Sequence, residues 1–173
     1  MDDFKQMYDE VNNCIRCGTR LILKEDREHK ERPHCPNCGW IYYKNPIPAS
    51  ACVVINNKNE LLLVKRKLAP HAGEWALPSG YIELWQSPEE CAVAELEEET
   101  GLVGEIVSFI DFYTGYSPIY LRTLSFGFLM KEVGGILQAG DDALEAVFYN
   151  QEELPDICFW SHQHFLRKIN YIK

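Results

Sequence analysis

The sequence predicts an α/β fold preceded by a small zinc ribbon. Three observations predict it: apolar runs with the length of buried strands, one helix with clear start and stop signals, and two Cys-x-x-Cys pairs. An extended, proline-containing segment follows the second pair, and apolar runs follow that segment. We therefore expect residues 1–46 to form the ribbon and its linker, and residues 47–173 to form the α/β domain.

The composition is that of a globular protein with one ordinary domain and a small appendage: 173 residues, 46 % hydrophobic and 25 % charged. The net charge of −9 argues against a nucleic-acid partner held mainly by its phosphates. A small phosphorylated substrate stays compatible with this charge, because bound divalent cations supply positive charge. The amino terminus has no signal-like apolar region, and no apolar run approaches the ~18 residues of a membrane span. The expected location is cytoplasmic, without a membrane segment.

Four of the seven cysteines form two pairs with the spacing of a structural zinc site. Seventeen residues separate the pairs, and a glycine follows each, which lets backbone amides turn toward sulfur. Four thiolates leave zinc no open position, so its expected role is structural. A disulfide framework is the alternative, which a cytosolic location disfavours. The predicted zinc ligands are Cys14, Cys17, Cys35 and Cys38.

Between the cysteine pairs we expect a strand over residues 19–23 and a charged hairpin tip over residues 24–32. Basic residues at the tip favour a nucleic-acid contact, but interleaved acidic residues nearly cancel them. His29 and His34 are interpreted as surface residues, because four cysteines already satisfy a tetrahedral ion. Residues 1–12 are interpreted as a short helix or a loose segment without a function.

The region after residue 49 reads as buried strands around one helix, followed by two long strands and a terminal helix. Residues 51–55 and 60–65 are expected to form a hairpin around an asparagine-rich turn. Residues 114–119 are expected to be a loop, and His162 and His164 surface residues of the terminal helix. The further expected strands cover residues 105–113, 121–130 and 147–150, the terminal helix covers 161–173, and the expected buried thiols are Cys52, Cys91 and Cys158.

A helix over residues 88–100 has an unusually complete set of end signals. Ser87 is a suitable N-cap, Pro88 fits the first helical position, and Glu90 completes a capping box. Gly101 is a natural C-terminal stop.

Three glutamates share one face of this helix. At about 100° per residue Glu95, Glu98 and Glu99 lie together, and like charges at these spacings repel. A solvated acidic face is one interpretation. The other is a site for a hard divalent cation, and it is favoured by the absence of Lys and Arg from residues 83–105.

The segment from Gly80 to Leu102 resembles the Nudix box, whose pattern is G-x5-E-x7-R-E-U-x-E-E-x-G-U with U a bulky aliphatic residue. Seven positions match, and two differ: Gln86 stands in place of Glu, and Ala94 in place of Arg. The resemblance implies that this Glu and this Arg make polar contacts in the box. Because both are replaced here, neither is left as a lone buried charge. The matching residues are Gly80, Glu95, Leu96, Glu98, Glu99, Gly101 and Leu102.

The resemblance implies a Nudix-type α/β/α sandwich with a mixed sheet, and hydrolysis of the diphosphate linkage of a nucleoside diphosphate derivative. It implies Mg²⁺ or Mn²⁺ held by Glu95, Glu98 and Glu99, with Asp142 or Glu145 as a further carboxylate. One of these carboxylates would accept the proton of the attacking water. The ribbon before the domain is similar to that of the NADH pyrophosphatase subgroup, so NADH, ADP-ribose or a nucleotide sugar is the implied substrate.

Candidate substrate-binding residues lie around this box. Arg66 is a candidate phosphate ligand, although a solvated strand end is the alternative. Gly80 belongs to the box, and Trp85 and Tyr116 are candidates for stacking on a base, although aromatic residues at strand ends often pack on the core. Two other function classes stay open: a weak or inactive Nudix domain that binds or senses a nucleotide derivative, and a nucleic-acid contact made by the ribbon. A homodimer is also a possible assembly.

Overall fold

The computed structural model describes residues 11–140 and 142–173 and divides into two compact units, Met1–Asn45 and Pro46–Lys173. The expectation for residues 1–12 lies, up to residue 10, outside the described residues. None of the described helices is long and apolar enough to cross a membrane.

The first unit is built around a two-stranded antiparallel ribbon of β1 (Ile22–Glu25) and β2 (Glu31–His34). The strand expected at residues 19–23 begins only at Ile22. Arg20 instead forms an isolated bridge with Asn13, on the other side of the turn that holds Cys14 and Cys17. The strands run into the charged segment, and only the residues between Glu25 and Glu31 form the turn.

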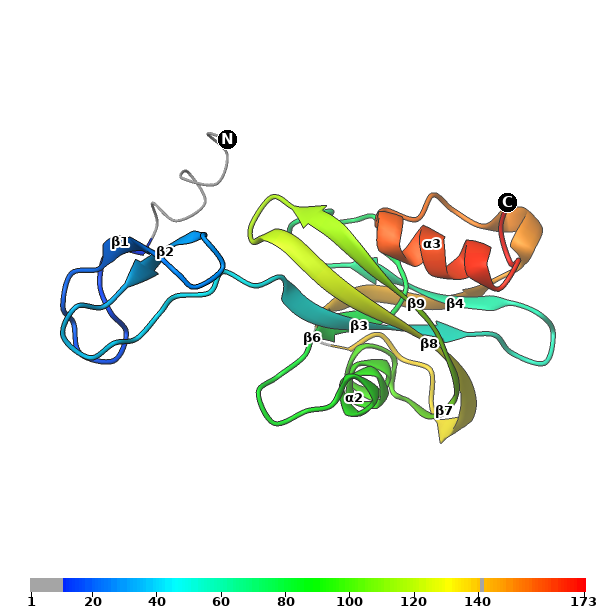
Figure 1. Cartoon of the computed structure of the whole chain (residues 1–173). Helices are drawn as coiled ribbons and strands as arrows, with labels where there is room; N and C mark the ends of the chain where they lie inside the picture. Colours follow the sequence, from blue (N-terminus) through cyan, green and yellow to red (C-terminus); the bar gives the residue numbers. More distant parts are fainter. Residues whose placement is uncertain (1–10, 141) are drawn as a thin grey trace. The chain divides into compact units, whose positions relative to one another are not determined.

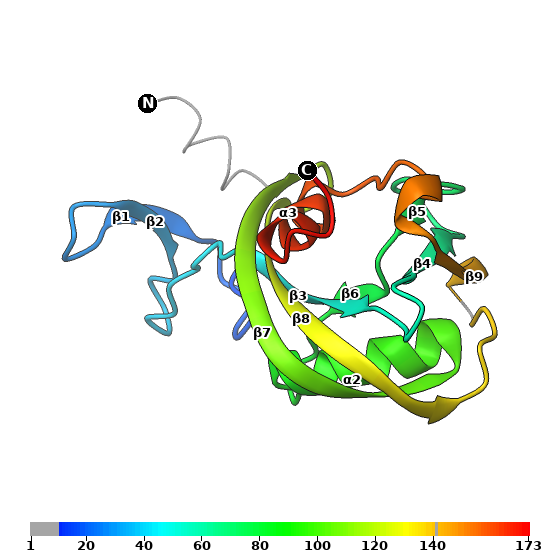
Figure 2. The ribbon, with the colours of Figure 1, turned by 90° about the vertical axis from the view of Figure 1, so that its right-hand side faces the viewer.

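The second unit contains a mixed sheet and a smaller antiparallel sheet (Figure 2). In the mixed sheet the order is β6-β3-β8-β7, with β3 and β8 parallel and the other pairs antiparallel. In the smaller sheet the order is β5-β4-β9. The strands are β3 (Ile47–Val54), β4 (Leu61–Arg66), β5 (Trp75–Ala76), β6 (Ser79–Tyr81), β7 (Leu102–Ser117), β8 (Leu121–Gly135) and β9 (Ala143–Tyr149).

The expected hairpin of residues 51–55 and 60–65 is wrong. The asparagine-rich turn forms, with the Asn59 amide donating to the Asn56 carbonyl at 3.0 Å, but only the bridge between Ile55 and Leu61 joins the two segments. Beyond it β3 pairs with β6 and β8, whereas β4 pairs with β5 and β9. Both strands are apolar on both faces, so each is placed inside a different sheet rather than in a shared two-stranded ribbon.

Two helices cover opposite faces of the sheets, as expected for an α/β/α sandwich (Figure 1). They are α2 (Pro88–Thr100) and α3 (Trp160–Lys168), and the 3₁₀ turn η1 (Gln151–Glu153) precedes α3. Alternate residues of β3 and β4 point to opposite faces, which creates two apolar layers. The layer under α3 includes Ala51, Val53, Leu61, Leu63, Phe165 and Leu166. The layer under α2 includes Cys52, Val54, Leu62, Ala92, Leu96 and Phe128.

Three expectations for the carboxyl-terminal half need correction. The expected loop over residues 114–119 is largely strand, because β7 continues to Ser117 and pairs there with Leu121. The terminal helix ends at Lys168 rather than at residue 173. His162 is buried, not a surface residue, and its Nδ1 accepts a 3.1 Å hydrogen bond from the Leu77 amide. His164 is partly buried and lies 3.0 Å from Asp111.

Candidate functional site

Helix α2 has the end structure that its sequence predicts. The Ser87 side chain accepts from the Glu90 amide, and the Glu90 side chain accepts from the Ser87 amide, which completes the capping box. At the other end Gly101 is left-handed, with φ 68°, and its amide donates to the Glu97 carbonyl. The local sequence therefore fixes where the helix begins and ends, and helical spacing places Glu95, Glu98 and Glu99 along one side of it.

Two of the three predicted glutamates turn toward strand β6, and the third faces solvent. Glu99 is buried, and its Oε2 accepts a 2.9 Å hydrogen bond from the Ser79 amide. Glu95 is half-buried beside Gly80, where an added Cβ would lie 1.8 Å from Glu95 Oε1. Glu98 is exposed. Only glycine at position 80 leaves room for the Glu95 carboxylate in this position.

The inward glutamates resist ionisation. Burial, followed by the charges of Glu98 and Asp142, raises the pKa of Glu95 to about 7. Burial and the charge of Glu95 raise the pKa of Glu99 to about 8, although the Ser79 amide and Arg66 act in the opposite direction. A pair of carboxyls with raised pKa values at one place is typical of a functional site.

The segment after β8 brings an additional carboxylate to these glutamates. Amides of this segment donate to the last carbonyls of α2, including Gly140 to Glu99 at 2.9 Å and Gln138 to Thr100 at 2.9 Å. Asp142 follows and acts electrostatically on both Glu95 and Glu99. The other candidate, Glu145, instead forms a 2.8 Å ion pair with Lys65 across β4 and β9.

Arg66 lies at the end of β4, within electrostatic range of Glu99. Its Nε donates to the Pro70 carbonyl at 2.9 Å, and its guanidinium stacks over the Phe159 ring at 5.0 Å. These contacts hold a cationic group beside the carboxylates, where the phosphates of a substrate would need one.

The two aromatic candidates are not gathered at this place. Trp85 is 78 % exposed in the loop before α2, and Tyr116 is 76 % exposed near the end of β7. Neither ring packs on the core, and the structure gives neither a contact with Glu95 or Glu99. Their role in base stacking stays a prediction.

The four ribbon cysteines form a compact cluster. The sulfur of Cys17 lies 3.5 Å from that of Cys35 and 3.7 Å from that of Cys38, and the sulfurs of Cys14 and Cys38 are 3.6 Å apart. These are non-bonded separations, so the disulfide alternative does not apply, and they approach the ~3.8 Å edge of a tetrahedron with ~2.3 Å zinc–sulfur bonds.

The turns around the cysteines supply the amide hydrogen bonds that the sequence predicts. The Arg16 amide donates to the Cys14 sulfur at 3.4 Å, and the Cys38 amide donates to the Cys35 sulfur at 3.5 Å. Gly18 and Gly39 have φ values of 73° and 75°, which glycine adopts without strain. The cluster is therefore preorganised for a thiolate-bound metal ion.

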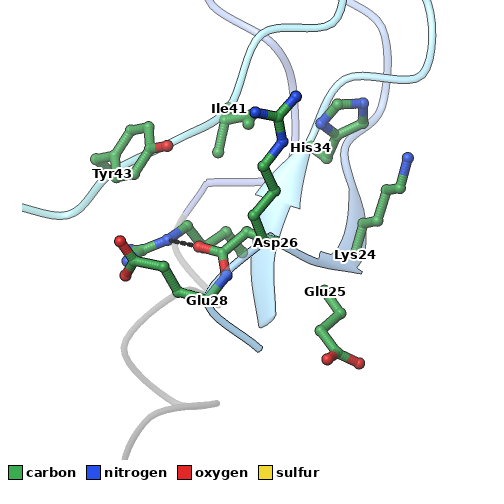
Figure 3. A pocket seen from close by; sticks show the side chains of 9 residues that line it. Lys24, Glu25, Asp26, Glu28, His34, Ile41 and Tyr43 are labelled. Carbon is green, nitrogen blue, oxygen red and sulfur yellow. Dashed lines mark hydrogen bonds and ion pairs between the residues drawn. The ribbon is translucent and has the colours of Figure 1, made fainter. Parts of the chain in front are cut away.

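A shallow hollow on the ribbon carries both signs of charge (Figure 3). Asp26 pairs with Arg32 at 2.7 Å, and Lys30 pairs with Glu28 at 2.9 Å. Two of the four basic residues at the tip are thus neutralised on the ribbon itself, which weakens the case for a nucleic-acid contact. The hollow is lined by Lys24, Glu25, Asp26, Arg27, Glu28, Arg32, His34, Ile41 and Tyr43.

Sequence reasoning missed two groups that hold the segment leading into β6 and Glu99 in place. The Ser79 amide is a backbone donor, which no side-chain pattern reveals. His162 was detectable, because it lies three and four residues before Phe165 and Leu166 on the apolar face of α3. Burial lowers its pKa to about 3, so it is a neutral acceptor that anchors the strand segment before Ser79.

Comparison with known proteins decides the family. The family model described as "NUDIX domain" matches residues 45–169. The chain belongs to the Nudix family. Its enzymatic class is therefore that of the Nudix pyrophosphohydrolases, and its zinc-ribbon-like cluster lies before the matched region.

Three similar proteins illustrate the comparison. An "ADP-ribose pyrophosphatase" of Methanocaldococcus jannaschii is 36% identical over 115 residues, which are 66% of this chain and 68% of that protein. A "NAD-capped RNA hydrolase NudC" of Pseudomonas aeruginosa is 26% identical over 145 residues, 83% of this chain and 49% of that protein, so the chain spans about half of its length. A Nudix hydrolase structure from Nitrosomonas europaea has a TM-score of 0.78 and 29% identity, and the match covers 91% of this chain and 89% of that one.

The two departures from the Nudix box leave no unpaired group. Gln86 closes the turn before α2 through two hydrogen bonds of 3.0 Å. Its side-chain Oε1 accepts from the Glu83 backbone amide, and its backbone amide donates to the Glu83 carbonyl. Ala94 occupies the position in α2 at which the box pattern has an Arg. Among the described residues no buried side-chain nitrogen or oxygen lacks a hydrogen-bond partner. The box is thus altered without a local defect.

The carboxylates of the Nudix glutamates are suitable ligands for a hard divalent cation, although their oxygen atoms do not all lie close together. Among the described residues, the groups of potential ligands within 4.8 Å of one another do not include Glu95, Glu98 and Glu99 together. Mutual repulsion and the Ser79 hydrogen bond account for this spread, because Glu99 turns inward while Glu98 turns outward. Three carboxyl groups near one helix end supply the oxygen ligands that Mg²⁺ or Mn²⁺ prefers.

Proposed function

We propose that this chain hydrolyses the diphosphate linkage of a nucleoside diphosphate derivative, with ADP-ribose as the first substrate and NADH or a nucleotide sugar as further candidates. Membership of the Nudix family supports the reaction class, and the similarity to an ADP-ribose pyrophosphatase supports the substrate class. The observation that carries the proposal is that Glu95, Asp142 and the Arg66 cation all lie within electrostatic range of Glu99, which β6 holds through the Ser79 amide.

In this proposal Glu95, Glu98 and Glu99 hold Mg²⁺ or Mn²⁺. The chemistry that such an ion supplies is neutralisation of phosphate charge and a lowered pKa for water. Arg66 binds a phosphate oxygen, and the Ser79 amide keeps the Glu99 carboxylate oriented. The proton acceptor is one of these glutamates or Asp142. Burial and neighbouring negative charge raise the pKa values of Glu95 and Glu99, which favours proton uptake by these two carboxyls.

The four cysteines hold a structural zinc ion in this proposal, and residues 1–46, the ribbon and its linker, take no part in the reaction. Support comes from the sulfur–sulfur separations of 3.5–3.7 Å and from the donor set, which leaves no coordination position for a substrate.

The test is an assay of ADP-ribose, NADH, FAD, nucleotide sugars, nucleoside triphosphates and NAD-capped RNA with Mg²⁺ or Mn²⁺. We expect mononucleotide release from a diphosphate-linked nucleoside, and a loss of at least ~100-fold in Glu98→Gln. The matched control is Glu97→Gln, because Glu97 is also exposed on α2 but lies on the other side. Hydrolysis that is equal in both variants would contradict the proposed site.

A binding or sensor function is the second candidate, favoured by the replaced box residues Gln86 and Ala94. It predicts micromolar or tighter binding of one of the same compounds without release of any product. The assay separates the two functions, because a calorimetric titration with the same panel detects binding whether or not turnover follows.

A further inference from the structure

Three side chains with metal-binding atoms converge at a place that is neither the ribbon nor the face of α2. They are His71, Glu74 and Cys158, and one potential ligand atom of each lies within 4.8 Å of the others. The four ribbon cysteines form the other such group among the described residues. The new group draws its members from two segments that are far apart in the sequence.

The loop between β4 and β5 positions the first two residues. The Gly73 amide donates to the Arg66 carbonyl at 2.7 Å, and the Glu74 amide donates to the His71 carbonyl at 3.1 Å, so the loop is folded into tight turns. These turns place His71 Nδ1 2.9 Å from Glu74 Oε2. An imidazole and a carboxylate therefore already share one position.

Backbone contacts bring the cysteine to this pair. The Cys158 amide donates to the Trp75 carbonyl at 2.9 Å, and Ile157 forms a parallel bridge with Trp75. Cys158 is partly buried, whereas the side chains of His71 and Glu74 are 39% and 55% exposed. The group thus has a sheltered thiol on one side and access to solvent on the other.

An aromatic contact restricts the imidazole. The His71 ring meets the Phe159 ring edge to face, with 5.1 Å between centroids, directly next to Cys158 in the chain. A ring held in this way loses less rotational freedom when it binds an ion, and groups that orient a ligand strengthen metal binding.

We propose that His71, Glu74 and Cys158 form a second transition-metal site, which takes a borderline divalent ion such as Zn²⁺. One nitrogen, one oxygen and one sulfur donor match the ligands that zinc accepts, whereas Mg²⁺ prefers oxygen alone. Binding forms the metal–sulfur bond and releases the thiol proton to solvent. Three protein ligands leave one tetrahedral position open on the exposed side, for water or a further ligand.

The site is coupled to the residue that we propose as a phosphate ligand. Arg66 Nε donates to the Pro70 carbonyl in the same loop, and its guanidinium lies over the Phe159 ring that His71 touches. A metal ion at His71 would therefore hold the loop on which the position of Arg66 depends. This consequence rests on the proposed function, but the metal site itself does not.

The test is a Co²⁺ titration of the full chain, loaded beforehand with one equivalent of zinc, which the four-thiolate ribbon binds in preference to a three-ligand site, and kept in excess Mg²⁺ to occupy oxygen-only sites. We expect about one further equivalent of Co²⁺ to bind with a thiolate-to-cobalt absorption band. Cys158→Ser should remove the band. His71→Ala should weaken binding by at least the ~10–100-fold that loss of a group supporting a metal ligand costs.

The matched control is His29→Ala. His29 also pairs with a glutamate, Glu25, but no cysteine belongs to that pair among the described metal-binding groups. The control should bind Co²⁺ like the unmodified chain. A missing band in the unmodified chain, a band that persists in Cys158→Ser, or equal losses in His29→Ala and His71→Ala would each overturn the proposal. His71 is exposed, so its variant tests the site even where Cys158→Ser does not fold.

Discussion

The Ser79 amide donates a 2.9 Å hydrogen bond to Oε2 of Glu99. This bond joins β6 to the last turn of α2, so the strand at the start of the Nudix box and the glutamate near its end hold one another in place. The arrangement leaves a buried carboxyl with a pKa of about 8, beside Glu95 with a pKa of about 7. Several predictions about stability and activity depend on this pair.

Without a divalent cation, the free energy of unfolding should fall as the pH rises from about 5 to 8. The pKa of Glu99 is raised in the folded state to about 8, so the folded chain binds more protons than the unfolded chain between the ordinary pKa of a glutamate and this value. The stability that this group contributes is therefore fully present at low pH and is lost as the pH rises through about 8.

Glu99→Gln keeps an oxygen for the Ser79 amide but removes the charge, so it should flatten this pH dependence and stabilise the metal-free chain by about 1–3 kcal/mol at pH 8. Urea unfolding at several pH values measures the effect. The same slope in both chains would show that Glu99 does not titrate in this range.

Gly80→Ala should displace the Glu95 carboxylate, because the new Cβ would lie 1.8 Å from its Oε1. The clash meets the flexible end of a side chain, so the fold should survive while metal-dependent hydrolysis falls by about 10–100-fold. Steady-state kinetics with increasing Mg²⁺ measure the loss. Gly134→Ala is the control, since nothing lies within 4 Å of its added Cβ, and an equal loss in that variant would contradict the explanation.

Local signals predicted helix α2 to the residue, whereas strand pairing could not be predicted from neighbours in the chain. The capping box and Gly101 act within a few residues, and the helix ends where they indicate. Strand β3 lies between β6 and β8, and its parallel pairing with β8 sets Ile47 opposite Thr123. A tight turn after β3 suggested a hairpin, but the burial of both strands on both faces decided the outcome.

The candidate site shows the same division between local and distant information. The stripe of Glu95, Glu98 and Glu99 follows from helical spacing, but the inward turn of two of them depends on β6. The choice of Asp142 over Glu145 as the neighbouring carboxylate depends on Lys65, which pairs with Glu145 from another strand. Such contacts join residues that the sequence does not place together.

Restoring the family residues with Gln86→Glu and Ala94→Arg should leave hydrolysis equal or raise it. Glu at position 86 can accept the same hydrogen bond from the Glu83 amide that Gln86 accepts at 3.0 Å. The new Arg and Glu supply opposite charges together, so neither is left alone. The rate constant kcat at saturating Mg²⁺ measures the change, and a large loss would mean that the present pair is adapted to another task.

Cys17→Ser should remove about one zinc ion per chain and loosen the ribbon while the Nudix domain stays folded. The two compact units, Met1–Asn45 and Pro46–Lys173, make separate loss of the first unit possible. Metal analysis and limited proteolysis check both parts, best in a Cys158→Ser chain so that only ribbon thiolates contribute. Unchanged zinc content, or cleavage throughout the domain, would count against a self-contained ribbon.

The central claim is that the glutamates at the end of α2 bind a divalent ion, and a Mn²⁺ titration followed by electron paramagnetic resonance of the free ion tests it most directly. The unmodified chain and Glu97→Gln should remove Mn²⁺ from solution with similar affinity, whereas Glu98→Gln should bind at least ~10-fold more weakly. Mn²⁺ binding that is absent from the unmodified chain, or equal in Glu98→Gln and Glu97→Gln, would contradict the account.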